Sequence, residues 1–199
     1  MVVLAYIILA FTAIQLIVSL ANLLTETSLP ETAKSHSSLV SVLIPARNEE
    51  HNIGGLLEDL KHQEYEHIEI VVYDDQSEDK TAQLVDEFSK SDNRIRMIGS
   101  GMLPEGWLGK NFACHSLAKE AGGSYLLFLD ADVRVSGNLI NRSISYSEKH
   151  NLSLISIFPK QIIKSTGERM PVPDMNYILL SLLPQALVSR SLYTSLSAA

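Results

Sequence analysis

An uninterrupted apolar stretch at the start of the chain limits its possible architectures more than any other feature. Residues 2–24 give 23 positions without a charged side chain, and about 20 apolar residues are enough for a helix to cross a bilayer. A core helix of a soluble domain is the alternative, although such helices are rarely apolar on every face over this length. No basic segment typical of a signal peptide precedes the run. We therefore expect residues 1–24 to form one uncleaved transmembrane anchor.

The residues next to this anchor say little about its orientation. No Lys or Arg precedes it, and Glu26 and Glu31 follow it before the first basic residue, Lys34. An excess of Lys and Arg normally marks the cytoplasmic side, so charge alone does not decide the matter. Residues 25–38 are polar, contain Pro30 and show no periodicity, which predicts a linker.

The overall composition excludes several classes of protein. The chain has 199 residues, with Lys and Arg totalling 16 against 23 Asp and Glu, and a formal net charge of −7. Binding to a nucleic-acid backbone requires a basic surface, so we expect no nucleic-acid partner. The single cysteine, Cys114, rules out a disulfide framework and a cysteine-rich zinc site.

From residue 39 onward, short apolar runs rich in Val, Ile and Leu alternate with amphipathic stretches. This alternation predicts an α/β fold with a mostly parallel sheet that is covered by helices on both faces. In such sheets a ligand binds beyond the carboxyl ends of the strands, so the polar residues that end each run are the candidates for a site. The expected strands are 39–46, 68–75, 95–99, 125–133 and 152–158, and the expected helices are 52–63, 78–90, 111–122 and 137–150.

The first strand ends in a group of mixed polar residues without a glycine-rich phosphate loop, which argues against a dinucleotide site. One interpretation is a ligand-binding turn. The other is an ordinary turn in which Asn48 or Asn52 caps the next helix. The candidate binding residues here are Pro45, Ala46, Arg47, Asn48 and Glu49.

Two adjacent carboxylates, Asp74 and Asp75, follow the second strand. Like charges side by side repel unless a ligand, a metal or solvent relieves them. Carboxylates at this position can accept hydrogen bonds from a sugar hydroxyl or a base. Ser77 is well placed to cap the following helix, but capping does not explain the pair of aspartates.

The fourth expected strand ends in Asp130 and Asp132, after the apolar and aromatic residues 125–129 predict burial. If the strand continues, side chains two positions apart point to the same face. Two converging carboxylates are suitable ligands for Mg²⁺ or Mn²⁺, which also bind water and phosphate oxygens. Two solvated acids at the start of a loop are the alternative.

A loop before the fourth strand places Lys110 at the start of a helix. It does not match a Walker loop, because Pro104 and Asn111 stand where that motif needs Gly and Ser or Thr. Lys110 either faces an anion together with the helix N-terminus or is simply solvated. Trp107 in the same loop either packs on the domain or contacts a ligand.

Four segments in order resemble a family 2 glycosyltransferase with the GT-A (Rossmann-like) fold. They are VSVLIPARNEE, VVYDDQSEDKTA, GWLGKNFAC and FLDADV, and the resemblance covers residues 39 to 160. The GWLGK segment is most similar to the branch that glycosylates lipids, including hopanoid, carotenoid and ceramide acceptors.

This resemblance implies a role for each candidate residue. The PARNEE segment and the Asp74–Asp75 pair would bind the base and ribose of the donor, and Lys110 its diphosphate. Asp130 would contact the ribose or the metal, and Asp132 the metal, Mg²⁺ or Mn²⁺. The implied reaction is inverting transfer of a sugar from a nucleotide-sugar, with a UDP-sugar as the expected donor, to a lipid acceptor in the cell membrane. Such donors are cytosolic, so the domain is expected on the cytoplasmic side.

The resemblance also implies that residues 39–165 form the donor-binding half of a larger domain. Residues 166–199 would begin the acceptor side and contain an interfacial apolar segment, since Pro184 and Arg190 argue against a second span. The catalytic base and a Gln-Arg-Trp element of the family lie beyond the Asp130 strand, and Glu168 and Asp174 show no matching motif.

We therefore expect an N-terminal fragment that is inactive alone, with its base beyond residue 199. A non-catalytic protein that binds a nucleotide-sugar or a partner remains the alternative. A nucleotidyltransferase is disfavoured, because its glycine-rich, Arg-containing loop is missing from residues 45–55.

Overall fold

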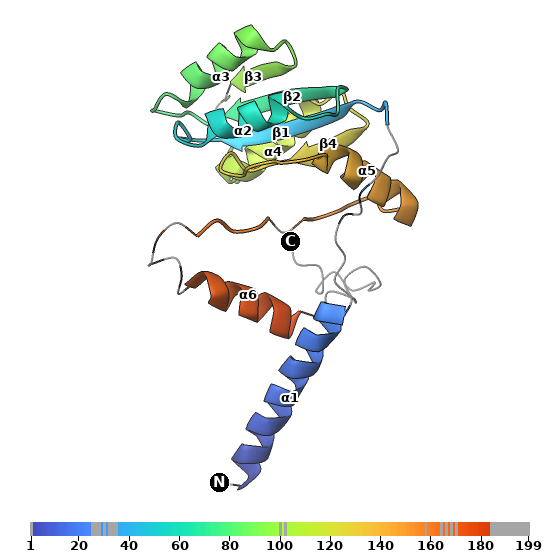
Figure 1. Cartoon of the computed structure of the whole chain (residues 1–199). Helices are drawn as coiled ribbons and strands as arrows, with labels where there is room; N and C mark the ends of the chain where they lie inside the picture. Colours follow the sequence, from blue (N-terminus) through green and yellow to red (C-terminus); the bar gives the residue numbers. More distant parts are fainter. Residues whose placement is uncertain are drawn as a thin grey trace. The chain divides into compact units, whose positions relative to one another are not determined.

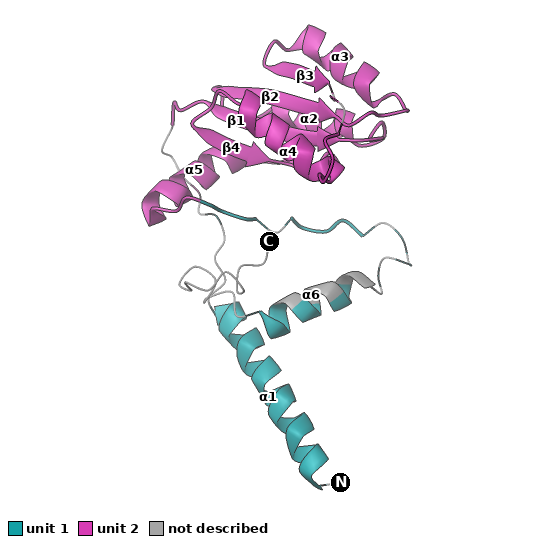
Figure 2. Ribbon diagram, turned by 180° about the vertical axis from the view of Figure 1, so that it is seen from behind, with its two compact units in different colours: residues 1–29, 154–199 teal, residues 30–153 magenta. Residues whose placement is uncertain are grey.

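The computed structural model describes two compact units of the chain, shown in Figure 2. One unit consists of residues 1–29 and 154–199, and the other of residues 30–153. Within them the described residues are 2–24, 29, 31, 36–99, 101, 103–157, 159–163, 165, 167, 169 and 171–183.

The unit of residues 30–153 is built on a four-stranded sheet (Figure 1). The strands are β1 (Val40–Ala46), β2 (Ile68–Asp74), β3 (Ile95–Gly99) and β4 (Tyr125–Phe128), in the order β3-β2-β1-β4. Every neighbouring pair is parallel. The parallel sheet predicted from the alternating pattern is confirmed.

Helices cover both faces of this sheet. Helices α2 (Ile53–Lys61), α3 (Thr81–Ser91) and α5 (Leu139–His150) contribute to the apolar cluster on one face. Helix α4 (Gly109–Glu120) packs on the opposite face. Each expected helix is present, with its ends shifted by a few residues.

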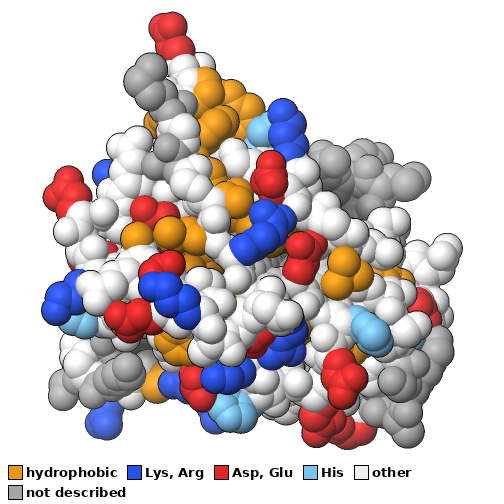
Figure 3. All heavy atoms as spheres, turned by 90° about the horizontal axis from the view of Figure 1, so that it is seen from above, with side chains coloured by type: hydrophobic (Ala, Val, Ile, Leu, Met, Phe, Trp, Pro, Cys, Tyr) orange, Lys and Arg blue, Asp and Glu red, His pale blue; other side chains and the backbone are white. Residues whose placement is uncertain are grey.

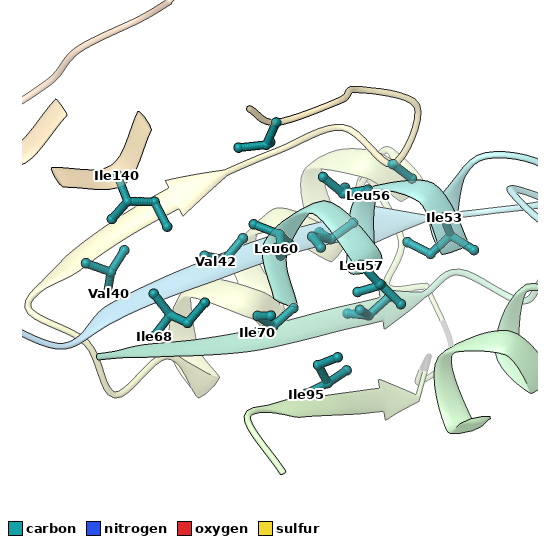
Figure 4. Packing of buried hydrophobic residues seen from close by; sticks show 14 of the residues in the cluster. Val40, Val42, Ile53, Leu56, Leu57, Leu60, Ile68, Ile70, Ile95 and Ile140 are labelled. Atoms are coloured by element: carbon teal, nitrogen blue, oxygen red, sulfur yellow. The ribbon is translucent and has the colours of Figure 1, made fainter. Parts of the chain in front are cut away.

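The central strand β1 is buried on both faces, which explains its continuous apolar sequence. Val42 and Ile44 belong to the cluster that contains α2, whereas Leu43 between them packs with α4. All three side chains are completely buried. Figure 4 shows how the α2 side chains lie over this face of the sheet, and its labelled residues are Val40, Val42, Ile53, Leu56, Leu57, Leu60, Ile68, Ile70, Ile95 and Ile140.

The fourth strand differs from its prediction. Strand β4 ends at Phe128, and a turn follows in which the amide of Val133 donates to the carbonyl of Asp130 at 3.3 Å. Leu126 and Phe128 are 46% and 45% exposed, so full burial of this strand was wrong. The reason is that β4 lies at one edge of the described sheet and α4 packs over β1 and β2.

The fifth expected strand is also wrong in the residues that are described. Residues 152–157 have no strand pairing, and residue 158 lies outside the described residues.

In the described residues of the other unit there are two helices, α1 (Val2–Leu24) and α6 (Pro171–Leu182), which pack against each other. Helix α1 is long and apolar enough to cross a membrane. Asn22, 4% exposed, donates from its side-chain amide to the carbonyls of Leu180 at 2.9 Å and Leu183 at 2.7 Å. These carbonyls belong to the C-terminal end of α6, where carbonyls have no partner within the helix.

Several predictions for the ends of the chain fall on residues outside this description. Of the linker 25–38, only residues 29, 31 and 36–38 are described. Glu168, Pro184 and Arg190 lie outside the described residues.

A partly buried hydrogen-bond network fixes the turn between α4 and β4. The Ser41 hydroxyl donates to Glu69 Oε1 at 2.5 Å and accepts from the amide of Gly123 at 2.8 Å. Glu69 Oε1 also accepts from the amide of Gly122 at 2.6 Å. Burial raises the pKa of Glu69, but the bonds from Ser41 and Gly122 and the charge of Arg96 outweigh it and keep the pKa below its ordinary value.

We predict that Gly123→Ala destabilises the fold and Gly122→Ala does not. A Cβ at position 123 would lie 2.7 Å from the backbone nitrogen of Ser41 and 2.8 Å from the carbonyl oxygen of Leu39, neither of which moves freely. Overpacking of this kind costs about 1–3 kcal/mol. At position 122 the nearest atom is Glu69 Oε1 at 3.4 Å. Thermal unfolding of the full chain in detergent, followed by circular dichroism, measures the difference, and equal losses in both variants would contradict this account.

Candidate functional site

A cleft opens at the carboxyl ends of β1, β2 and β4, next to the start of α4. Its volume is about 420 Å³. In the strand order β3-β2-β1-β4, β2 and β4 lie on opposite sides of β1, and parallel sheets typically bind ligands where the order reverses in this way. The lining residues are Pro45, Ala46, Arg47, Glu49, Asp75, Gly109, Lys110, Ala113, Asp130, Ala131 and Asp132.

The structure thus brings most of the predicted site residues together, although they come from four separate segments. Two predicted donor-binding residues, Asn48 and Asp74, do not line the cleft.

Asn48 instead joins the loop after β1 to the loop after β2. Its backbone adopts φ of 55°, in the left-handed region where Asn is one of the better-tolerated residues. Its amide donates to the Ser77 hydroxyl at 3.0 Å, and its side-chain oxygen accepts from the amide of Glu78 at 2.9 Å. Asn48 therefore fixes the turn that carries its neighbours Arg47 and Glu49.

Two further bonds join the same loops. The amide of Glu49 donates to the Thr81 hydroxyl at 2.7 Å, and the amide of Glu50 donates to Asp79 Oδ2 at 3.0 Å. The capping predictions for Asn52 and Ser77 were wrong, because neither side chain caps its helix. Ser77 accepts from Asn48 in place of the helix amides.

Asp74 is the last residue of β2, and its side chain is only partly accessible. Its Oδ1 atom is buried without a hydrogen-bond partner in the described part of the chain. Asp74 is therefore adjacent in sequence to Asp75, which lines the cleft, but Asp74 does not line the cleft itself.

Lys110 and Asp130 form the shortest ion pair of the cleft. Lys110 Nζ lies 2.6 Å from Asp130 Oδ1, and both side chains are more than half exposed. The hydrogen bond to Asp130 raises the pKa of Lys110. The ammonium group is therefore held at the position where Asp130 and Asp132 meet the start of α4.

Asp75 lies between Arg47 and the first residue of α4. Arg47 Nη1 is 3.6 Å from Asp75 Oδ2. A Cβ at position 109 would approach Asp75 Oδ2 to 2.7 Å, so a larger residue there would push this carboxylate out of its present position. The positive end of a helix dipole favours a carboxylate in this position.

The formal charge of the cleft follows from its lining. Arg47 and Lys110 face four carboxylates, those of Glu49, Asp75, Asp130 and Asp132, which leaves a charge of −2. Basic and acidic side chains are likewise interspersed on the face drawn in Figure 3.

Asp130 and Asp132 lie in the turn after β4, so they converge without the strand continuation assumed from sequence. In the described residues no group of three or more His, Cys, Asp or Glu is placed to hold a metal ion. Two carboxylates are hard-oxygen ligands that fit Mg²⁺ or Mn²⁺ when water or phosphate completes the shell. The donor set is therefore suited to a metal that arrives with a phosphate ligand.

Trp107 packs on the domain. Its ring centroid lies 5.6 Å from that of Phe112 and 5.0 Å from that of His115. This contact places the side chain on α4, and Trp107 does not line the cleft.

Comparison with known proteins identifies the family to which this geometry belongs. The family model described as Glycosyl transferase family 2 matches residues 41–197. The chain belongs to this family. The prediction from the four motifs is confirmed.

Two curated relatives illustrate the similarity. A 4,4'-diaponeurosporenoate glycosyltransferase of Staphylococcus haemolyticus is 32% identical over 133 residues, which cover 66% of this chain and 34% of the relative. A UDP-Glc:alpha-D-GlcNAc-diphosphoundecaprenol beta-1,3-glucosyltransferase of Escherichia coli is 34% identical over 117 residues, covering 59% and 44%. The matched part of the chain thus spans less than half the length of either relative.

A solved structure supports the GT-A fold of this family member. A mannosyltransferase of Pyrobaculum calidifontis in complex with GDP-Man and Mn²⁺ superposes with a TM-score of 0.54 at 20% identity, covering 70% of this chain and 42% of that chain. The predicted fold class is confirmed.

Sequence reasoning missed an ion pair that holds the turn carrying both aspartates of this glycosyltransferase family member. Arg134 Nε and Nη2 each lie 2.6 Å from an oxygen of Asp59 in α2, and the amide of Val135 donates to Asp59 Oδ2 at 3.0 Å. The bond from Arg134 keeps the pKa of Asp59 below its ordinary value, although burial raises it. Asp59 and Arg134 are 75 residues apart, and no local motif signals their pairing.

We predict that Asp59→Asn loosens this turn. The variant loses the ion pair and weakens the acceptor of the Val135 amide, at a cost of about 1 kcal/mol. Hydrogen exchange at the Val135 amide should become faster, because local opening of the turn, which breaks the hydrogen bond of this amide, then requires less free energy. The control is Glu58→Gln, which removes an exposed carboxylate on the adjacent position of α2. Unchanged exchange at Val135 in Asp59→Asn would show that the clamp does not hold the turn.

Proposed function

We propose that this chain carries the nucleotide-sugar site of a membrane-anchored, inverting glycosyltransferase that uses a UDP-sugar and a lipid acceptor. The observation that carries the proposal is the convergence of Lys110, Asp130 and Asp132 with Asp75 in one cleft at the strand ends. These residues combine a cation for phosphate with carboxylates for a sugar hydroxyl, a base and a divalent metal.

In this proposal the two sides of the cleft bind different parts of the donor. The segment 45–49 and Asp75 contact the base and the ribose, with Asn48 holding the backbone of that segment. Lys110 pairs with the diphosphate, and the N-terminus of α4 adds favourable partial charge. Asp130 and Asp132 complete the site on the other side.

Charge balance explains why a divalent cation is part of the proposal. The lining carries a formal charge of −2, and a nucleoside diphosphate is also an anion, so the two repel without a cation between them. Mg²⁺ or Mn²⁺ held by Asp132 and Asp130 fits the oxygen donors present. When bound, the ion supplies Lewis-acid stabilisation of the leaving diphosphate. Lys110 adds a second positive charge at the position where negative charge develops.

The lipid acceptor is supported by the unit that contains α1 and α6. Helix α1 is apolar over its whole length and is the candidate membrane span. The C-terminal part of α6 also exposes apolar side chains, including Ile178 at 54% and Leu182 at 52%, which suits an interfacial helix beside an anchor. The names of both relatives mention lipid substrates, a diaponeurosporenoate and a diphosphoundecaprenol. Because nucleotide-sugars are cytosolic, we place the cleft on the cytoplasmic side of the cell membrane.

We predict that UDP with Mn²⁺ stabilises the full chain and that Asp132→Ala abolishes this effect. At UDP about 100 times above its Kd, Tm should rise by about 5–10 °C. GDP and CDP should give smaller shifts if the base contacts favour uracil. The control Asp86→Ala removes an exposed aspartate of α3 that pairs with Lys90, and it should keep the full shift. Equal stabilisation of wild type and Asp132→Ala would contradict the metal assignment.

We also predict that Gly109→Ala weakens UDP binding without a comparable loss of stability. The added Cβ would press on Asp75 Oδ2 at 2.7 Å and displace the proposed base-binding carboxylate. Loss of about 1–2 kcal/mol from a displaced hydrogen bond of Asp75 to the ligand corresponds to a roughly tenfold rise in Kd. Gly99→Ala is the matched control, because a Cβ there meets nothing within 4 Å. Isothermal titration measures both, and an unchanged Kd for Gly109→Ala would remove Asp75 from the donor site.

A further inference from the structure

Both cationic side chains of the cleft are paired with carboxylates of the same cleft. Lys110 Nζ is bound to Asp130 Oδ1 at 2.6 Å, and Arg47 Nη1 lies 3.6 Å from Asp75 Oδ2. Each cation that the proposed function directs to a ligand is therefore paired with a carboxylate of the same cleft. The closer pair involves Asp130, one of the two carboxylates assigned to the metal.

We propose that Lys110 and the divalent cation compete for Asp130, so that the metal binds firmly only when a diphosphate draws the lysine away. This inference rests on the proposed function. The ammonium group of Lys110 occupies one of the two oxygens of Asp130, Oδ1, at hydrogen-bond distance, and its charge opposes a metal ion on the other oxygen. Two cations on one oxygen would also lie within a few ångströms of each other, where their repulsion is strong.

The small number of carboxylates in the site makes binding of the metal depend on the diphosphate. Asp130 and Asp132 are the carboxylates assigned to the metal, and no cluster of three ligating side chains occurs in the described residues. Mg²⁺ and Mn²⁺ prefer six oxygen ligands and readily share phosphate oxygens. With Asp130 Oδ1 held by Lys110, a metal without nucleotide would have Asp132, water and the second oxygen of Asp130 as its remaining ligands, and that oxygen lies beside a positive charge. Binding of metal alone is therefore weak.

A nucleoside diphosphate removes both obstacles at once. Its phosphate oxygens complete the coordination of the metal, and its negative charge offers Lys110 an alternative partner. Lys110 can make this exchange without repacking, because its side chain is 64% exposed at the start of α4. Metal and nucleotide thus promote each other's binding, and the coupling is reciprocal by thermodynamic necessity.

The consequence is that the cleft selects a ligand that contains both the divalent metal and the diphosphate. A divalent ion alone has to displace Lys110 from Asp130, and a nucleotide alone meets a cleft whose formal charge is −2. The metal–diphosphate complex meets neither penalty. Lys110 is therefore a positioning residue for the metal as well as a phosphate contact.

The test measures Mn²⁺ binding to the full chain in detergent, from the electron paramagnetic resonance signal of free Mn²⁺, with and without UDP. In Lys110→Met, Mn²⁺ alone should bind about two- to five-fold more tightly than in wild type, which is the range set by the loss of one exposed ion pair. Lys110→Arg keeps the pair with Asp130 and should behave as wild type. Circular dichroism confirms that each variant is folded.

A second control separates exchange on Asp130 from a general change of electrostatic potential. Arg47→Met removes a positive charge from the same cleft, but from the side paired with Asp75, and should tighten Mn²⁺ binding by less than Lys110→Met. The factor by which UDP tightens Mn²⁺ binding should be smaller in Lys110→Met than in wild type. No gain in Lys110→Met, or an equal gain in Arg47→Met, would overturn the competition. Failure of UDP to bind wild type even with Mn²⁺ would instead overturn the proposed function.

Discussion

The candidate site depends on the pairing of β1 with a parallel strand on each side. β1 pairs with β2 from Val40↔Ile68 to Ala46↔Asp74, and with β4 from Val40↔Tyr125 to Leu43↔Phe128. Because all three strands run in the same direction, their carboxyl ends meet at one edge of the sheet. A shift of one residue in either pairing would move every side chain to the opposite face. The double-sided burial of β1 prevents such a shift, since its apolar residues fit clusters on both faces.

The loops after β1 and β2 use some of their polar side chains to hold the backbone and others to line the cleft. Asn48, Asp79 and Thr81 satisfy backbone amides of the neighbouring loop, and none of them lines the cleft. Arg47 and Glu49 alternate with Asn48 and do line it. Because these hydrogen bonds already fix the backbone of the loops, the loops lose little further conformational entropy when a ligand binds. The clamp between Asp59 and Arg134 has the same effect on the turn of Asp130 and Asp132, from the side of α2.

Sequence patterns predicted the features that depend on local order and missed those that depend on distant contacts. Apolar runs with polar ends predicted four of the five expected strands and most of the cleft lining, because burial and strand ends are local properties. The length of β4 was wrong, since Leu126 and Phe128 look buried in sequence but lie at an edge. Asn48 is a polar residue at a strand end, as a binding residue would be. Only its hydrogen bonds with Ser77 and Glu78 show its structural role. The close approach of Gly109 to Asp75 became visible only in the structure.

In the proposed function an acidic chain binds an acidic ligand, which is an electrostatic conflict, and the arrangement of the cleft would resolve it in two steps. Without a ligand, the pairs of Lys110 with Asp130 and Arg47 with Asp75 limit repulsion among four carboxylates in a small volume. With a metal–diphosphate ligand, the same carboxylates and cations are used again with new partners. The affinity is then the difference between the new pairs and the old ones, and not the sum of the new contacts. A site of this kind gains selectivity at the expense of affinity, which in the proposed function would favour release of the nucleotide product after each reaction.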